Sequence, residues 1–259
     1  MVNPINRYLV PVLLMCLIGN VGAQQPQPRN LSYFDQISIQ GSETRFCRCQ
    51  VDTAGRINGR GCDLPSEHGS QAIVAQWLSM RQLASWVETA CTDSTRHSGM
   101  QRAQCDFIEG RVNRAWAHPV NQVLAAPGLR SVLDQHIWDL SDTVEFSGYS
   151  LGYEGCGIAG RVGSTGLMLP SHARGDFARV VFFLVSRYNL PLPGEVIRQL
   201  DVWDYEDPIN GLELRTEQAR WEFGVEHNPL ILDRRASPEA EFRYKLTGAI
   251  SNVFGSESR

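Results

Sequence analysis

The chain has 259 residues, of which 42% are hydrophobic and 20% are charged. This length is enough to bury a substantial core, as one larger domain or as one domain with long loops. Basic residues number 24 and acidic residues 28, so the net charge is −4. Proteins that bind nucleic acid strongly and non-specifically gain affinity from Lys and Arg side chains that neutralise phosphates. The acidic balance disfavours that class, although a basic patch on one face stays compatible with it.

The N-terminal segment has the features of a secretory signal peptide. Arg7 precedes an apolar run over residues 8–18, and the small residues Val21, Gly22 and Ala23 form a cleavage site. The run is too short to span a bilayer comfortably. We therefore predict export to the periplasm or the medium, with no membrane span. The predicted organisation is a signal peptide over residues 1–23, a leader over 24–44, one domain over 45–254 and a tail over 255–259.

Cysteine usage agrees with export. Of the seven cysteines, Cys16 lies in the predicted signal peptide, and the remaining even number favours disulfides in an oxidising compartment. The remaining cysteines are Cys47, Cys49, Cys62, Cys91, Cys105 and Cys156. Their connectivity is open, although Cys91 and Cys105 bracket a short polar loop that one bridge would close. Zinc binding at Cys47 and Cys49 is the competing interpretation, but no Cys-x-x-Cys pair or histidine at ligand spacing supports it.

The first third of the predicted domain favours β-structure. Residues 45–51 alternate loosely between polar and apolar side chains and precede a glycine-rich turn at residues 58–61. This pattern predicts a short hairpin tied by Cys47, Cys49 and Cys62.

The next regular segment covers residues 71–87, which contain no Gly or Pro. Ile73, Trp77, Met80 and Ala84 recur there at helical spacing, so we predict helix for at least part of it. Residues 141–166 are rich in glycine, which predicts irregular structure.

The C-terminal third favours helices. Residues 180–185 are continuously apolar and on composition alone would form a buried strand. A helix is predicted from Pro193, because proline is tolerated in a first helical turn and Val196, Leu200 and Trp203 fall on one face. A further helix is predicted between residues 210 and 223.

Several motifs in this part of the chain resemble one protein family. They are residues 173–179 (ARGDFAR), residues 187–190 (RYNL), Trp203, Pro208 and residues 226–230 (EHNPL). With matching spacing, they resemble the C-terminal third of the endonuclease I family, secreted metal-dependent nucleases of the His-Me finger type. The resemblance implies a helix-rich, disulfide-bonded α+β fold of the ββα-metal kind, in which residues 173–188 form a buried helix. It gives residues 227–229 a structural role at a turn.

The resemblance also implies where a nuclease site would lie. That family uses a Glu-His pair at the start of the site helix and a downstream Asn; the Glu and Asn oxygens hold one hard cation and the His acts as general base. Trp77 sets the corresponding position here, where the Glu-His pair is replaced by Leu78 and Ser79. Pro119 sets the downstream register, which places Trp116 at the position of the Asn. The resemblance therefore implies a degenerate site with no metal.

Other residues are candidates to replace the missing groups. Glu67 and His68 form a Glu-His pair well before the expected position, which favours a surface loop, and His118 is a candidate for a relocated base. Arg174 and Arg179 are weak candidates for phosphate contacts. Asp176 lies three residues before Arg179, so an ion pair within one helix is the favoured interpretation.

The expected function is therefore that of a secreted endonuclease I-like protein that has lost its nuclease activity and binds a protein or nucleic acid partner. No cofactor is predicted. The first alternative is an active Mg²⁺-dependent endonuclease with a rearranged site, and the second is a structural protein of the cell envelope.

Overall fold

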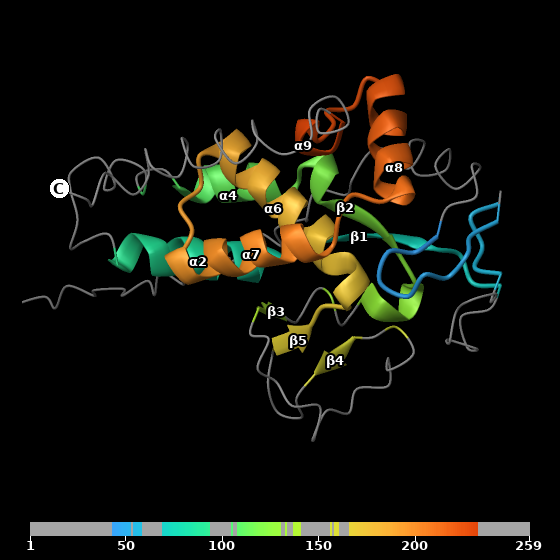
Figure 1. Cartoon of the computed structure of the whole chain (residues 1–259), viewed down its shortest axis with the longest axis horizontal. Helices are drawn as coiled ribbons and strands as arrows, with labels where there is room; N and C mark the ends of the chain where they lie inside the picture. The colour runs from blue at the N-terminus through green and yellow to red at the C-terminus, as the bar shows by residue number, and fades with distance from the viewer. Residues whose placement is uncertain are drawn as a thin grey trace, which may run out of the picture.

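The structure is a computed structural model that describes residues 43–52, 54–58, 69–93, 105, 108–130, 133, 137–140, 156, 158–160 and 166–232. Helices and two small sheets make up this part of the chain (Figure 1). The helices are α2 (Met80–Asp93), α4 (Ile108–Trp116), α6 (Arg174–Tyr188), α7 (Gly194–Glu206), α8 (Gly211–Glu222) and α9 (Pro229–Leu232), with the 3₁₀ turns η3 (Pro119–Asn121), η4 (Pro127–Leu129) and η6 (Ser171–Ala173). The strands are β1 (Ile73–Gln76), β2 (Gln122–Ala125), β3 (Ile137–Asp139), β4 (Ala159–Gly160) and β5 (Gly166–Met168).

This mixture confirms the predicted α+β class, while the specific His-Me finger arrangement stays a prediction. The predicted signal peptide, most of the leader and the tail lie outside the described residues. None of the helices in the described ranges is long and apolar enough to cross a bilayer.

Strands β1 and β2 form an antiparallel pair in which Ile73 lies opposite Ala125 and Gln76 opposite Gln122. The predicted helix over residues 71–87 is therefore correct only from Met80 onward. Residues 73–76 before it form strand β1, because they pair with β2, whose residues are all buried. The second sheet has the order β3-β5-β4, with β3 parallel to β5 and β4 antiparallel to it.

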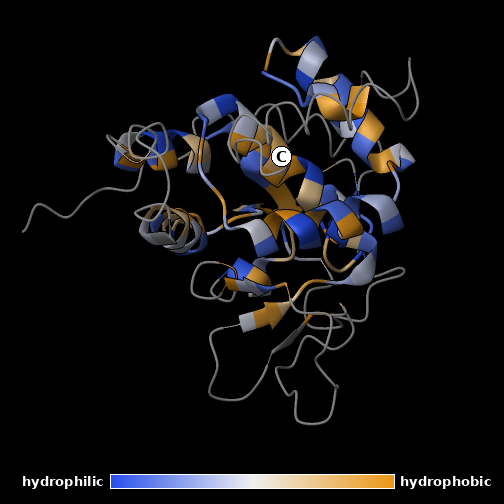
Figure 2. Cartoon of the chain, turned by 60° about the vertical axis from the view of Figure 1, so that its left-hand side comes forward, coloured by the Kyte–Doolittle hydropathy of each residue, from blue (hydrophilic) through white to orange (hydrophobic). Residues whose placement is uncertain are grey.

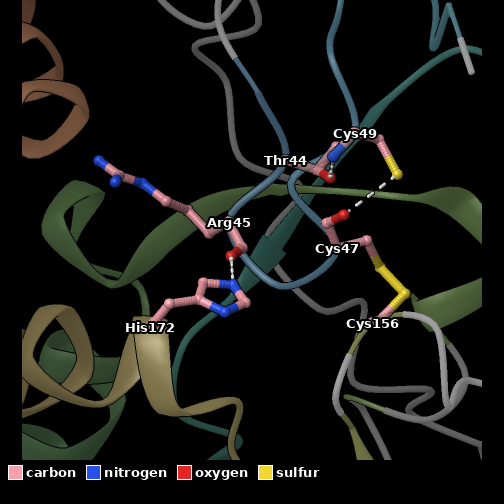
Figure 3. The surroundings of a disulfide bond; sticks show 6 residues. All are labelled: Thr44, Arg45, Cys47, Cys49, Cys156 and His172. Carbon is pink, nitrogen blue, oxygen red and sulfur yellow. Dashed lines mark hydrogen bonds between the residues drawn. A yellow bond between two sulfur atoms is a disulfide. The ribbon is translucent and has the colours of Figure 1, made fainter. Parts of the chain in front are cut away.

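The short hairpin predicted from residues 45–51 is present only in part. Residues 45–47 form a turn, and the Thr44 hydroxyl accepts a hydrogen bond from the Cys49 N–H at 3.1 Å (Figure 3). Only isolated bridges follow, between Glu43 and Gln50 and between Val51 and Ile57. The turn directs Cys47 toward Cys156, and their disulfide joins residues 109 positions apart.

A second disulfide joins Cys91 at the end of α2 to Cys105, as the short loop between them predicted. Cys49 is disulfide-bonded as well. Cys62 lies outside the described residues. These bridges are compatible with the predicted export.

Helix α6 carries the core. Its residues 175–184 are all buried, so the helix predicted from the family resemblance is confirmed and the strand suggested by composition is wrong. The Phe177 ring packs edge-on against the rings of Trp77, Trp86, Trp138 and Trp203, with centroid distances of 6.2 to 6.4 Å. Trp203 is therefore a core residue.

Helix α6 ends at Tyr188, and the next residue, Asn189, closes it. Asn189 adopts a left-handed conformation (φ 49°) that closes the helix, a position asparagine tolerates. Helix α7 begins directly after Pro193 and packs against α6, which confirms the helix predicted there (Figure 1). Helix α8 begins with a capping box in which Asn210 and Glu213 satisfy each other's backbone N–H groups.

Candidate functional site

Leu78 occupies the position that the resemblance assigns to the metal-binding Glu. It lies between β1 and α2, and its side chain has no exposed surface. The Leu78 N–H donates to Asn121 Oδ1 at 2.9 Å, and Asn121 Nδ2 donates to the Leu78 carbonyl at 3.2 Å. Its apolar side chain fills core volume and its backbone is held on both sides.

Ser79 occupies the position of the catalytic His and serves as the N-terminal cap of α2. Its hydroxyl accepts a hydrogen bond from the Gln82 N–H at 3.1 Å, the contact that a capping serine makes with the third helical residue. The Gln82 side chain bonds to both backbone groups of Trp138, at 3.0 and 3.2 Å. The spacing Ser79-x-x-Gln82 is a start signal for a helix at Met80, which the interpretation of residues 71–87 as one segment missed.

The amide side chain beside Leu78 belongs to Asn121, in η3. Trp116, which the sequence placed at the position of the family's Asn, is the last residue of α4 and contributes its carbonyl, which accepts from Asn121 Nδ2 at 2.9 Å. The Asn121 carbonyl accepts from the Trp77 N–H at 2.8 Å. Asn121 is fully buried and joins the ends of β1 and α4. Sequence reasoning missed it, because its partners are distant along the chain.

His118 caps η3. Its Nδ1 accepts a hydrogen bond from the Val120 N–H at 3.0 Å, and its Nε2 lies 3.1 Å from Glu226 Oε2. Burial lowers the pKa of His118 below its ordinary value of 6.5, against the opposite effect of Glu226. A general base needs a free ring nitrogen, and Nδ1 is occupied by Val120. His118 is therefore a structural histidine in this conformation.

The remaining candidates from the sequence are Glu67, His68 and Arg174. Glu67 and His68 lie outside the described residues. The Arg174 guanidinium lies over the Trp203 ring at 5.1 Å, and its Nε donates to the Leu169 carbonyl at 3.3 Å.

Arg179 has no exposed surface, so the weak assignment of a phosphate contact does not fit the structure. Its guanidinium donates to Glu213 Oε1 at 2.8 Å and Oε2 at 2.7 Å, to Asp204 at 3.0 Å, to Asp176 at 3.1 Å and to the Asp207 carbonyl at 2.8 Å. These contacts use all five donors of an arginine side chain. They include the ion pair with Asp176 that the sequence favoured.

We call Arg179, Asp176, Asp204 and Glu213 the Arg179 cluster. Its buried hydrogen bonds and ion pairs link α6 to α7 and α8, at a place where packed helices usually bury apolar side chains. Burial, together with the nearby Asp176 carboxylate, raises the pKa of Glu213 to about 8. Asn228 extends the network, since its Nδ2 donates to the Arg179 carbonyl at 3.0 Å and its Oδ1 accepts from the Leu230 N–H. Asn228 thus has the structural role predicted for the turn at residues 227–229.

A cavity of about 40 Å³ lies beside Trp77. Its wall includes Arg45, paired with Asp176 at 3.0 Å, and Arg220, paired with Glu217. A water molecule needs about 10–15 Å³ of such volume. The cavity therefore has room for a few water molecules and is far too small for a nucleotide.

The residues at the implied metal position do not fit a hard divalent cation. Such an ion takes several converging oxygen ligands, whereas Leu78 offers none and the oxygens of Ser79 and Asn121 accept hydrogen bonds from the backbone. Within the described ranges, no group of three or more His, Cys, Asp or Glu residues is placed to hold a metal ion.

No family model matches the chain, and no curated protein is significantly similar to it. The resemblance to the endonuclease I family therefore stays a prediction from the sequence motifs.

Proposed function

We propose that this chain is a binding protein on an endonuclease I-like scaffold and that it does not cleave phosphodiester bonds. The contacts of Leu78, Ser79 and Asn121 are the main support. A metal-dependent nuclease needs oxygens that converge on one cation and a base with a free nitrogen. Here the side chain of Leu78 packs in the core, the Ser79 hydroxyl caps a helix, and the Asn121 amide holds backbone groups.

Helix α8 supports a binding role. Its buried side carries Glu213, Glu217 and Arg220, at spacings of four and three residues. Leu214 and Trp221 lie on one flank of the helix, about a quarter turn from that side, and the Trp221 side chain is 64% exposed. Charged side chains thus occupy much of the buried side, where a surface helix usually places apolar residues. Figure 2 shows apolar and polar residues alternating along the helical ribbons. An exposed tryptophan is typical of the residues that anchor protein interfaces.

The first test is a cleavage assay on the purified, disulfide-intact protein. We expect no cutting of plasmid DNA or of single-stranded RNA in Mg²⁺ beyond the level measured in EDTA. Cleavage that requires Mg²⁺, and that is lost in the Glu67→Ala variant, would support the alternative of an active nuclease with a rearranged site. Screening the preparation for contaminating nuclease requires a mock purification from cells that lack the gene.

The second test addresses binding through α8. A photo-crosslinking side chain is placed at position 221, and as a matched control at the exposed position 215 of the same helix, in cells that export the protein. We expect a discrete adduct from position 221 that excess unmodified protein competes away. The same adducts from both positions, or none from position 221, would contradict binding by this face.

A further inference from the structure

His118 connects three segments that are far apart in the sequence. It caps η3, its ring packs against the rings of Phe183 and Tyr188 in α6, and its Nε2 meets Glu226 between α8 and α9. The ring centroids lie 5.2 Å from Phe183 and 5.8 Å from Tyr188. The imidazole is almost completely buried.

The hydrogen bonds define the tautomer of this ring. The Val120 N–H points at Nδ1, so Nδ1 must carry a lone pair. The proton of the neutral ring is therefore on Nε2, which donates to Glu226 Oε2 at 3.1 Å. An imidazolium carries a proton on both nitrogens. Protonation would place an N–H at Nδ1 against the N–H of Val120, and the cap could not persist.

The cap lies next to the contacts that hold Leu78. Asn121 is the last residue of η3, and its N–H donates to the His118 carbonyl at 2.9 Å. The same Asn121 holds both backbone groups of Leu78 and accepts from the Trp77 N–H. A conformational change in η3 would therefore alter the start of α2 through the Asn121 side chain.

We propose that His118 is an acid-sensitive latch, whose protonation removes the cap on Val120 and releases the hold of Asn121 on Leu78. The latch follows from the geometry around η3 and does not depend on the proposed function.

The charges around the ring decide when the latch opens. Burial is the largest influence and keeps the pKa of His118 below its ordinary value, and Arg220 and Arg187 act in the same direction. Glu226 alone among these charged neighbours favours the imidazolium, and it also accepts from Arg187 Nε at 2.7 Å. Burial raises the pKa of Tyr188, so this neighbour is neutral in acid. The latch is therefore closed at neutral pH and opens in acid.

Amide hydrogen exchange on the full disulfide-bonded protein tests the latch. Protection of the Leu78 and Val120 amides is measured between about pH 7.5 and 4.5, corrected for intrinsic exchange, while ¹⁵N shifts follow the His118 ring. Below the His118 pKa, protection of both amides should fall by about tenfold per pH unit. The Leu190 amide, which bonds to the Val185 carbonyl in α6, is the internal reference. Unchanged protection of Leu78 and Val120 through the His118 titration would overturn the proposal.

Two variants separate His118 from other acid-titrating groups. Asparagine is a good N-cap and does not titrate, so His118→Asn should keep Val120 protected and remove the pH dependence. Glu226→Gln removes the charge that favours the imidazolium, so the transition should move to lower pH. Because the Glu226 side chain is 44% exposed, this variant tests the proposal even if His118→Asn does not fold. An unchanged transition in His118→Asn, or a transition at the same or higher pH in Glu226→Gln, would contradict the latch.

Discussion

Asn121 holds Leu78 by both backbone groups, with its Oδ1 2.9 Å from the Leu78 nitrogen and its Nδ2 3.2 Å from the Leu78 oxygen. The two residues are 43 positions apart and both are fully buried. This pair joins the strand-to-helix connection before α2 to the turn after α4. The position that the resemblance implies for a metal ligand is therefore a buried packing contact between two segments.

The contacts of Asn121 predict the cost of removing its amide. Asn121→Ala leaves a buried N–H and a buried carbonyl of Leu78 without these partners, and each such group costs about 1–3 kcal/mol. We expect the free energy of unfolding, measured in urea, to fall by about 3 kcal/mol. Gln218→Ala on the exposed side of α8 is the control and should change it by less than about 0.5 kcal/mol. Equal effects of the two variants would contradict the assignment.

Ser79 is predicted to act as a helix cap. Ser79→Ala should lower the free energy of unfolding by about 1 kcal/mol. Ser79→Thr keeps an acceptor oxygen at the same place and should retain most of the stability. Thermal unfolding followed by circular dichroism gives both values. If Thr were as damaging as Ala, the role of the hydroxyl as a cap would be wrong.

The Arg179 cluster is predicted to be sensitive to loss of its cation. Arg179→Met leaves Asp176, Asp204 and Glu213 buried without their shared partner, a situation that typically costs about 3–5 kcal/mol. Arg187→Met is the matched control, because Arg187 pairs with Glu226 on the exposed surface, where screening by solvent weakens an ion pair. Urea unfolding should show a much larger loss for position 179. Similar losses at both positions would be inconsistent with a buried cluster.

The raised pKa of Glu213 predicts that stability changes with pH. In the folded protein the pKa is about 8, against an ordinary value of 4.5. Between these values the folded state holds a proton that the unfolded chain releases, so the contribution of this group is complete below pH 4.5 and is lost as pH rises toward 8. The ¹³C shift of the Glu213 carboxyl, assigned with Glu213→Gln, measures the midpoint directly. A midpoint near 4.5 would refute this prediction.

The contribution of His118 to stability has the opposite pH dependence. Its pKa is lowered by burial in the folded state, so the unfolded chain binds the proton more readily below pH 6.5. Stability from this group is complete above pH 6.5 and declines as pH falls through the folded pKa. Urea unfolding at several pH values should show the decline in the wild type and not in His118→Asn. The same decline in both proteins would assign it to other groups.

Helices α7 and α8 could be predicted because their signals are local, whereas α6 was predicted only from the family resemblance, since the apolar run over residues 180–185 suggests a strand on composition alone. Pro193 marks the start of α7, and the motifs around residues 173–190 mark α6. The front of the domain was harder, because residues 71–87 contain no Gly or Pro to separate β1 from α2. The Ser79-x-x-Gln82 spacing is the only local sign of that boundary that we identify.

Other features depend on contacts that no local pattern contains. Asn121 meets Leu78 only after β1 and β2 have paired. The buried charges of α8 oppose the usual apolar inner side of a helix, so hydrophobic periodicity does not predict which side faces inward. Arg179 of α6 accounts for Glu213, because its guanidinium donates to both Glu213 oxygens, and Glu217 pairs with Arg220 of the same helix.

The most direct measurement is the stability of Leu78→Glu, which restores the residue type that the resemblance implies for a metal-binding position. If Leu78 belongs to the core, burial of a carboxylate there should cost several kcal/mol or prevent folding. Leu78→Met, which conserves volume, should cost less than about 1.5 kcal/mol. A Leu78→Glu protein as stable as the wild type in urea would show that the position is open to solvent or to a cation, and would contradict the account.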